Sequence, residues 1–134
     1  MKKILIAPDS FKGSLSAIQA ARIIAEEASR AFPQAEVIQL PIADGGEGLV
    51  EAVLAFKGGQ RHFLQVHNPM MRPVDAVYGE LPDGSAVMEM AAAAGLPLVG
   101  EGERDIMRAT TYGVGELISN AVQRGLDPIY VGLG

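Results

Sequence analysis

The sequence contains no cysteine among its 134 residues. This absence excludes disulfide bonds, thiolate metal sites and cysteine nucleophiles. Basic residues are also few, because 11 Lys and Arg stand against 16 Asp and Glu and give a net charge of −5. Such a balance argues against nucleic acid or an anionic membrane as the main partner. An anionic ligand would therefore need local help from lysine, arginine or backbone N–H groups.

Long hydrophobic runs are absent as well. The start of the chain has two lysines like the basic flank of a signal peptide, but its apolar stretch is too short and ends at Pro8. No later run approaches the length of a membrane span. We therefore expect a soluble cytoplasmic protein. With 49% hydrophobic and 20% charged residues, the chain is typical of one globular domain, or of one domain and part of another.

The first 59 residues are predicted to alternate strands and helices. Ile4–Ala7 is a short apolar run typical of a strand buried on both faces. Ser16 and Gln19 indicate a capping box that opens a helix ending before Pro33. Glu36–Ile42 is the second predicted strand. A second helix follows, with an apolar face of Leu49, Val50, Val53 and Leu54, and Gly58-Gly59 ends it.

The pattern changes after Gly59. Phe63–Val66, Val74–Tyr78 and Ala86–Met90 are extended segments joined by turns, which predicts a hairpin and a second, mixed sheet. A helix is predicted with Leu117, Ile118, Ala121 and Val122 on one face, before a final strand over Pro128–Gly134. The fold class expected is α/β: a Rossmann-like or flavodoxin-like parallel sheet begins in residues 1–60, and a second mixed α/β domain begins, truncated, in residues 61–134.

Two loops of similar chemistry follow the first two predicted strands. The first, Asp9–Gly13, carries a carboxylate, a hydroxyl and a lysine, and the second, Asp44–Gly48, carries two carboxylates and three glycines. Neighbouring parallel strands joined by a right-handed crossover would place both loops at the same edge of the sheet, where open α/β sheets bind ligands. The alternative for the second loop is an ordinary glycine-rich turn from strand to helix.

Four segments together resemble the bacterial-type glycerate kinase family. They are Ile6–Ser14, Pro41–Gly48, Met88–Leu96 and Thr110–Ile118. The resemblance implies ATP-dependent phosphorylation of D-glycerate on a two-domain α/β fold, with the active site between the domains. Members of the family are more than twice as long, so the chain resembles the N-terminal portion of a kinase that lacks its C-terminal part. A homo-oligomer is possible, and ATP and Mg²⁺ are the implied cofactors.

In phosphoryl transfer, cations, oriented donors and metal-binding carboxylates position and stabilise the moving group. Lys12 is the candidate cation for the glycerate carboxylate or the phosphoryl group, and its alternative is a solvated loop lysine. Asp44 is the candidate base or Mg²⁺ ligand. Asp9 and Glu47 are alternates for the metal, unless their charges only stabilise helix N-termini. The remaining candidate substrate-binding residues, for some of which capping is an equal alternative, are Asp9, Ser10, Gly45, Gly46, Thr110, Thr111 and Tyr112.

Other polar residues have more ordinary interpretations. Glu89 lies between two methionines, and a solvent-facing position in an alternating strand is slightly favoured over burial. His62 and His67 occupy polar positions of a strand pattern and are expected at the surface. The two methionines are expected in the core. Two functions other than catalysis stay open: a small-anion-binding module that uses the same two loops, and an inactive fragment.

Overall fold

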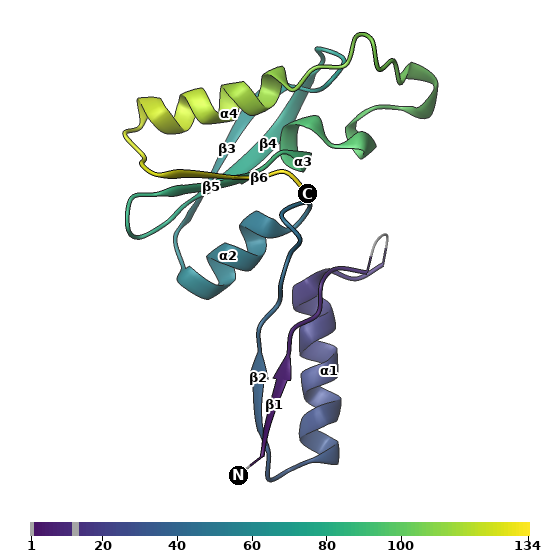
Figure 1. Cartoon of the computed structure of the whole chain (residues 1–134), viewed down its shortest axis with the longest axis vertical. Helices are drawn as coiled ribbons and strands as arrows, with labels where there is room; N and C mark the ends of the chain where they lie inside the picture. Colours follow the sequence, from purple (N-terminus) through teal and green to yellow (C-terminus); the bar gives the residue numbers. More distant parts are fainter. Residues whose placement is uncertain (1, 12–13) are drawn as a thin grey trace. The chain divides into compact units, whose positions relative to one another are not determined.

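The computed structural model describes residues 2–11 and 14–134 and divides the chain into two compact units, Met1–Asp44 and Gly45–Gly134 (Figure 1). No helix in the described part of the chain is both long and apolar enough to cross a membrane.

The first unit consists of two strands and one helix. Strands β1 (Lys3–Ile6) and β2 (Glu36–Gln39) pair in parallel, and helix α1 (Ala17–Ala31) connects them. The predicted capping box is confirmed, since the Ser16 side chain accepts from the Gln19 N–H and the Gln19 side chain accepts from the Ser16 N–H. This reciprocal pair satisfies two helix donors that would otherwise lack a partner.

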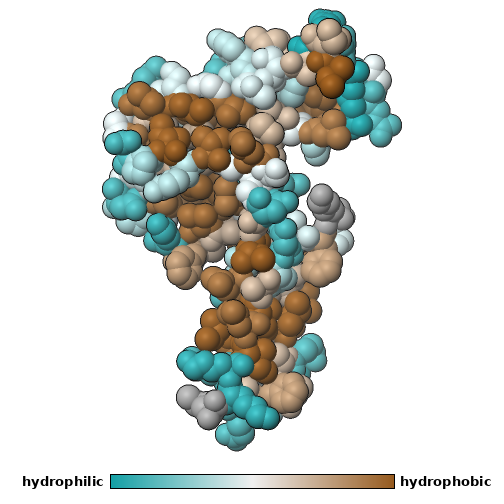
Figure 2. Space-filling view, in the orientation of Figure 1, coloured by the Kyte–Doolittle hydropathy of each residue, from teal (hydrophilic) through white to brown (hydrophobic). Residues whose placement is uncertain are grey.

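Helix α1 covers one face of this small sheet. Ile6, Ala21 and Ala25 are buried together between β1 and α1. Leu5 points to the other face and is 60% exposed, so burial of the first strand on both faces was a wrong expectation within this unit. Figure 2 shows hydrophobic side chains gathered over the strands of the unit. Two parallel strands cannot form a closed core of their own, because parallel sheets are normally covered on both faces.

The second unit is built on a four-stranded sheet with the order β3-β4-β5-β6. Its strands are β3 (Gln60–His67), β4 (Pro73–Glu80), β5 (Ala86–Glu89) and β6 (Ile129–Gly132). The first three are antiparallel neighbours, and β6 pairs with β5 in parallel. The α/β class with a small parallel sheet and a mixed sheet is thus confirmed.

Helices cover both faces of the mixed sheet (Figure 1). Ala86 and Met88 of β5 face the core formed with α3 (Ala91–Ala94) and α4 (Tyr112–Gln123), whereas Val87 faces helix α2 (Leu49–Lys57). Two short 3₁₀ turns, Leu96–Leu98 and Glu101–Glu103, lie between α3 and α4. Alternation along a strand sends successive side chains to opposite faces, which explains how four buried residues in a row serve two cores.

Helix α2 belongs to the second unit. Val50 and Leu54 pack against Val87 of β5 and against Leu81, which directly follows β4. The sequence predicts this helix in the first domain, with the boundary after residue 60, whereas the compact units divide between Asp44 and Gly45. Local periodicity identifies the apolar face of a helix, but it does not indicate which sheet that face will cover.

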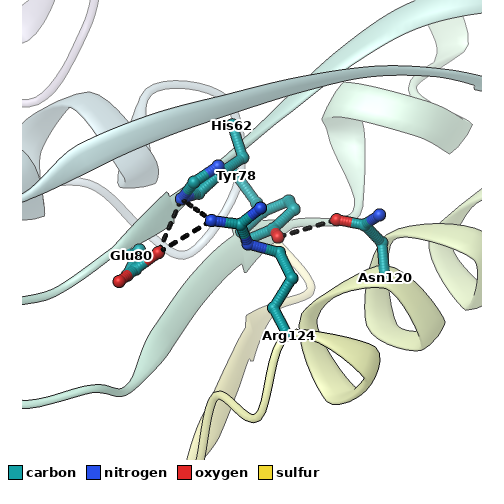
Figure 3. A network of polar contacts seen from close by, with 5 residues as sticks. All are labelled: His62, Tyr78, Glu80, Asn120 and Arg124. Carbon is teal, nitrogen blue, oxygen red and sulfur yellow. Dashed lines mark hydrogen bonds and ion pairs between the residues drawn. The ribbon is translucent and has the colours of Figure 1, made fainter.

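A polar network ties the end of α4 to the start of the sheet (Figure 3). His62 Nε2 lies 2.7 Å from Glu80 Oε2, and the Arg124 guanidinium lies 3.5 Å from the same carboxylate oxygen. The hydroxyl of Tyr78, a fully buried residue, donates to Asn120 Oδ1 at 2.8 Å. Both histidines were expected at the surface, yet only 17% of the His62 side chain is exposed. The end of the sheet at which β3 begins is therefore held by buried and half-buried polar pairs.

Two glycines in the first turn of α4 provide a matched test of packing. A Cβ on Gly113 would lie 2.0 Å from the backbone oxygen of His67, whereas a Cβ on Gly115 would meet nothing within 4 Å. We expect Gly113→Ala to destabilise the fold by about 1–3 kcal/mol, because backbone on both sides must move. Gly115→Ala should instead stabilise it by up to about 1 kcal/mol through helix propensity. Urea unfolding of both variants measures this, and equal effects would contradict the close approach at Gly113.

Tyr78 should give the stability a pH dependence in the alkaline range. Burial raises the pKa of Tyr78 above its ordinary value near 10, since the phenolate would lose its hydration. The stabilisation by neutral Tyr78 is therefore complete below pH 10 and lost as the pH rises through the higher folded pKa. In urea unfolding between pH 8 and 11, Tyr78→Phe should reduce the loss of stability above pH 10, with Tyr130→Phe of an exposed tyrosine as control. An unchanged slope in Tyr78→Phe would refute this assignment.

Candidate functional site

Three strands of the mixed sheet end at the same edge. Because β4 is antiparallel to both β3 and β5, and β6 is parallel to β5, the carboxyl ends of β3, β5 and β6 coincide. His67, Glu89 and Gly132 are the last residues of these strands. Ligands of α/β sheets bind outside the carboxyl ends of strands, so this edge is the candidate site of the second unit.

The glycine turn Gly45–Gly48 packs directly on the end of β6. A Cβ at Gly132 would lie 2.2 Å from the Gly45 oxygen and 2.3 Å from the Cδ2 atom of Leu49. Gly45 and Gly48 have φ angles of 95° and 93°, which side chains rarely adopt. Glycine is thus required at Gly45 and Gly48 for the conformation of the turn. It is also required at Gly132, where the turn packs on β6 and leaves no room for a Cβ.

Glu89 contacts the start of the helix that follows the glycine turn. Its Oε2 accepts a hydrogen bond of 3.1 Å from the Val50 N–H. The residue is only 8% exposed, so the solvent-facing position favoured from the sequence was wrong. The partner lies 39 residues away in the chain. No local pattern around Glu89 could have revealed it.

A pocket of about 400 Å³ lies beside this contact. Three carboxylates line it, those of Glu47, Asp75 and Glu89, and apolar side chains such as Phe63 and Leu98 complete its walls. Acidic groups on an apolar wall favour a cation or hydroxyl groups over an anion. Glu47, predicted as a metal ligand, is thus one of three carboxylate residues that line this pocket.

The predicted Thr110–Tyr112 segment leads into α4. Thr110 Oγ1 accepts from the Tyr112 N–H at 3.1 Å, which is a capping contact. Thr111 is the N-cap residue, but its side chain makes no cap hydrogen bond. Both threonines also line a second, largely apolar pocket of about 620 Å³ with Met70 and Ile106. Thr110 thus has the capping role that was left open, and Thr111 keeps its hydroxyl for other partners.

A histidine–glutamate pair joins the end of β3 to α4. His67 Nδ1 lies 3.0 Å from Glu116 Oε1, and the His67 N–H donates to Glu116 Oε2 at 2.8 Å. The ring of Tyr112 meets the imidazole edge-on at 5.8 Å between centroids. No role for Glu116 is predicted from the sequence. The only hint of this contact in the sequence is a carboxylate one turn into a predicted helix, next to residues of the apolar face.

In the first unit, the predicted Asp9 and Asp44 lie at one edge. Backbone pairing continues past the two strands, with Leu40 N–H donating to Ile6 O at 2.8 Å and Ile42 N–H to Pro8 O at 3.1 Å. Both aspartates follow directly, at the carboxyl edge of the parallel pair, as the sequence predicted. Asp9 Oδ1 accepts from the Ser10 N–H at 2.6 Å, so this carboxylate already binds the backbone of the next residue.

Two residues of the first predicted loop are not described by the structure. Lys12 and Gly13 lie outside the described residues. Among residues 2–11 and 14–134, no group of three or more His, Asp or Glu side chains could hold a metal ion. Mg²⁺ is commonly bound by one or two carboxylates together with water and substrate phosphates. The predicted Asp44 and Glu47 match that donor set and remain predictions.

Comparison with known proteins identifies the family. Residues 4–134 match the profile of the Glycerate kinase family. Over 133 residues the chain is 45% identical to a glycerate kinase of Bacillus subtilis (strain 168) and 44% identical to a glycerate 2-kinase of Escherichia coli (strain K12). In both cases 98% of this chain but only 35% of the relative is covered.

The structural comparison agrees with the sequence comparison. A crystal structure described as a glycerate kinase 2 of Salmonella typhimurium LT2 superposes with a TM-score of 0.83 at 43% identity. The match covers 99% of this chain and 36% of that one. The chain thus spans about a third of the length of the relatives it matches, and it belongs to the glycerate kinase family.

Proposed function

We propose that this chain forms part of an enzyme that transfers a phosphoryl group from ATP to a hydroxyl group of D-glycerate. The observation that carries the proposal is the glycine turn Gly45–Gly48 seated on Gly132 at the carboxyl edge of a sheet, in a member of the glycerate kinase family. A turn without side chains lets a substrate approach the backbone closely. Carboxylates before and within this turn supply the polar groups that the reaction needs.

The roles of the residues follow from the charges of the reaction. Asp44 accepts the proton of the attacking hydroxyl, or holds Mg²⁺, which supplies charge stabilisation for the phosphates when bound. Glu47 is the second candidate ligand, since its pocket offers oxygen donors. Lys12 binds the glycerate carboxylate or the phosphoryl group as a positive point charge. Ser10 and Thr111 supply hydroxyl groups for orienting the substrate.

The proposal is tested with a full-length enzyme that contains these 134 residues. D-glycerate and Mg·ATP are varied separately, and ADP release and phosphoglycerate formation are both measured. Phosphoglycerate formed only with both substrates supports the proposal. Binding of glycerate without any turnover would instead favour a small-anion-binding module, and neither binding nor turnover would indicate an inactive fragment.

We expect Asp44→Asn to lower kcat by about a hundred- to ten-thousand-fold, the range typical of a lost general base. The KM for glycerate should change little, because the glycerate carboxylate is bound elsewhere and Asp44 acts on charge that develops during transfer. Steady-state kinetics with both substrates varied gives the comparison. Near-normal kcat at saturating substrate would show that Asp44 only shapes the turn.

Lys12→Ala should behave differently, since its charge is present before and during transfer. We expect a higher KM for glycerate as well as a lower kcat. Lys57→Ala is a matched control, because Lys57 is an exposed lysine in the last turn of α2, away from the N-terminal end of that helix. A Lys12→Ala variant with the same kinetic constants as Lys57→Ala would exclude a role for Lys12 in binding the substrate.

A further inference from the structure

We infer that Glu89 is a positioning residue of the proposed site: its carboxylate replaces the missing N-cap side chain of α2 and thereby fixes the Gly45–Gly48 turn and Glu47. The inference rests on the proposed function for its kinetic consequence. The contact that carries it is the hydrogen bond from the Val50 N–H to Glu89 Oε2.

Helix α2 begins without a cap of its own. The first N–H groups of a helix have no partner within the helix and are normally satisfied by a Ser, Thr, Asp or Asn side chain at the N-cap. Here the N-cap is Gly48, with a left-handed backbone and no side chain to accept a hydrogen bond. The Leu49 N–H reaches back to Gly46 O at 3.2 Å, and the next N–H, that of Val50, is taken by Glu89.

The position of Glu89 is costly for stability alone. It ends a strand whose four residues are all buried, and it shares its pocket with two more carboxylates. A buried carboxylate loses its hydration. The positive end of the helix dipole offsets part of this cost. An apolar residue in the same place would stabilise the core more than a carboxylate does. We therefore attribute the carboxylate of Glu89 to its role in positioning the start of α2.

A closed set of contacts links Glu89 to the glycine turn. Glu89 is the register partner of Gly132 in β6, and the Met90 N–H donates to Gly132 O at 2.8 Å. Gly132 in turn lies against the Gly45 oxygen, so closely that no Cβ would fit. Val50 is 1% exposed in the core under α2. Three contacts therefore hold the start of α2 and the glycine turn on the end of β6. They are the packing of Gly45 on Gly132, the burial of Val50 and the hydrogen bond to Glu89, which is the only one of the three that a side-chain polar group makes.

The test uses three variants of the full-length enzyme, with hydrogen–deuterium exchange of peptides covering residues 49–54 and steady-state kinetics as readouts. Glu89→Ala removes the acceptor. We expect exchange at the start of α2 to rise at least tenfold and kcat to fall at least tenfold, with KM for glycerate changed less than threefold. Glu89→Gln keeps an amide oxygen that can accept from Val50, so exchange should stay within about threefold and kcat should be partly restored.

Glu51→Ala is the matched control. Glu51 also carries its charge in the first turn of α2, but its carboxylate pairs with Arg61 at the surface and does not contact the Val50 N–H. Its loss should leave both exchange and kcat within about twofold of the starting enzyme, because exposed ion pairs contribute little.

Three results would overturn the inference. They are unchanged exchange in Glu89→Ala, an equal loss of kcat in Glu89→Ala and Glu51→Ala, and a loss of activity in Glu89→Gln as complete as in Glu89→Ala despite normal exchange. The last result would mean that the charge acts on the substrate directly. If the unmodified enzyme does not phosphorylate glycerate, the proposed function fails, while the exchange measurements still decide whether Glu89 caps α2.

Discussion

The candidate site of the second unit depends on one steric constraint, the approach of the Gly45–Gly46 backbone to the backbone of Gly132 and Gly134. At Gly132 the space for a Cβ is already taken by a carbonyl oxygen and a leucine methyl group, and at Gly134 it would lie 3.1 Å from the Cα atom of Gly46. Glycine on both sides lets the turn lie flat on the end of β6. The position of α2 follows from this contact, because the helix begins only one residue after the turn and must then bury Val50 against the sheet.

The polar groups at this edge are arranged around that contact. Glu89 satisfies the helix that the glycine turn leaves uncapped, and the His67–Glu116 pair fixes the end of β3 against α4. Gly113 makes the second arrangement possible in the same way as Gly132 makes the first, by leaving room for a backbone oxygen. At two places, therefore, a glycine permits close backbone approach and a glutamate from a distant element binds a backbone N–H. Both contacts lie at the edge of the sheet where β3, β5 and β6 end.

Local signals in the sequence predicted much of this architecture. The Ser16–Gln19 box, the turns between the extended segments after Gly59 and the glycine turn each depend on a few neighbouring residues, so a short stretch of sequence contains all the contacts that form them. The sequence could not indicate that α2 covers the mixed sheet, or that Glu89 is buried on Val50, because both depend on contacts between segments far apart in the chain. Alternation suggested that Glu89 faces water, but its face of β5 is covered by α2. The prediction failed at the residue that has a specific polar partner, as is common at functional sites.

The charge at the start of α2 also limits what the glycine turn can bind. Helix N-termini usually attract phosphate through free N–H groups and a positive dipole. Here the Val50 N–H is occupied by a carboxylate, and Glu47 and Asp75 add negative charge to the same pocket. The N–H of Tyr112, at the start of α4, is likewise taken by Thr110. The pocket at α2 therefore suits a cation or the hydroxyl groups of a substrate better than a phosphate. Within the proposed function, cations such as Lys12 or Mg²⁺ must therefore neutralise the negative charge of the phosphoryl group. Glu47 would then bind the cation and not the phosphoryl group.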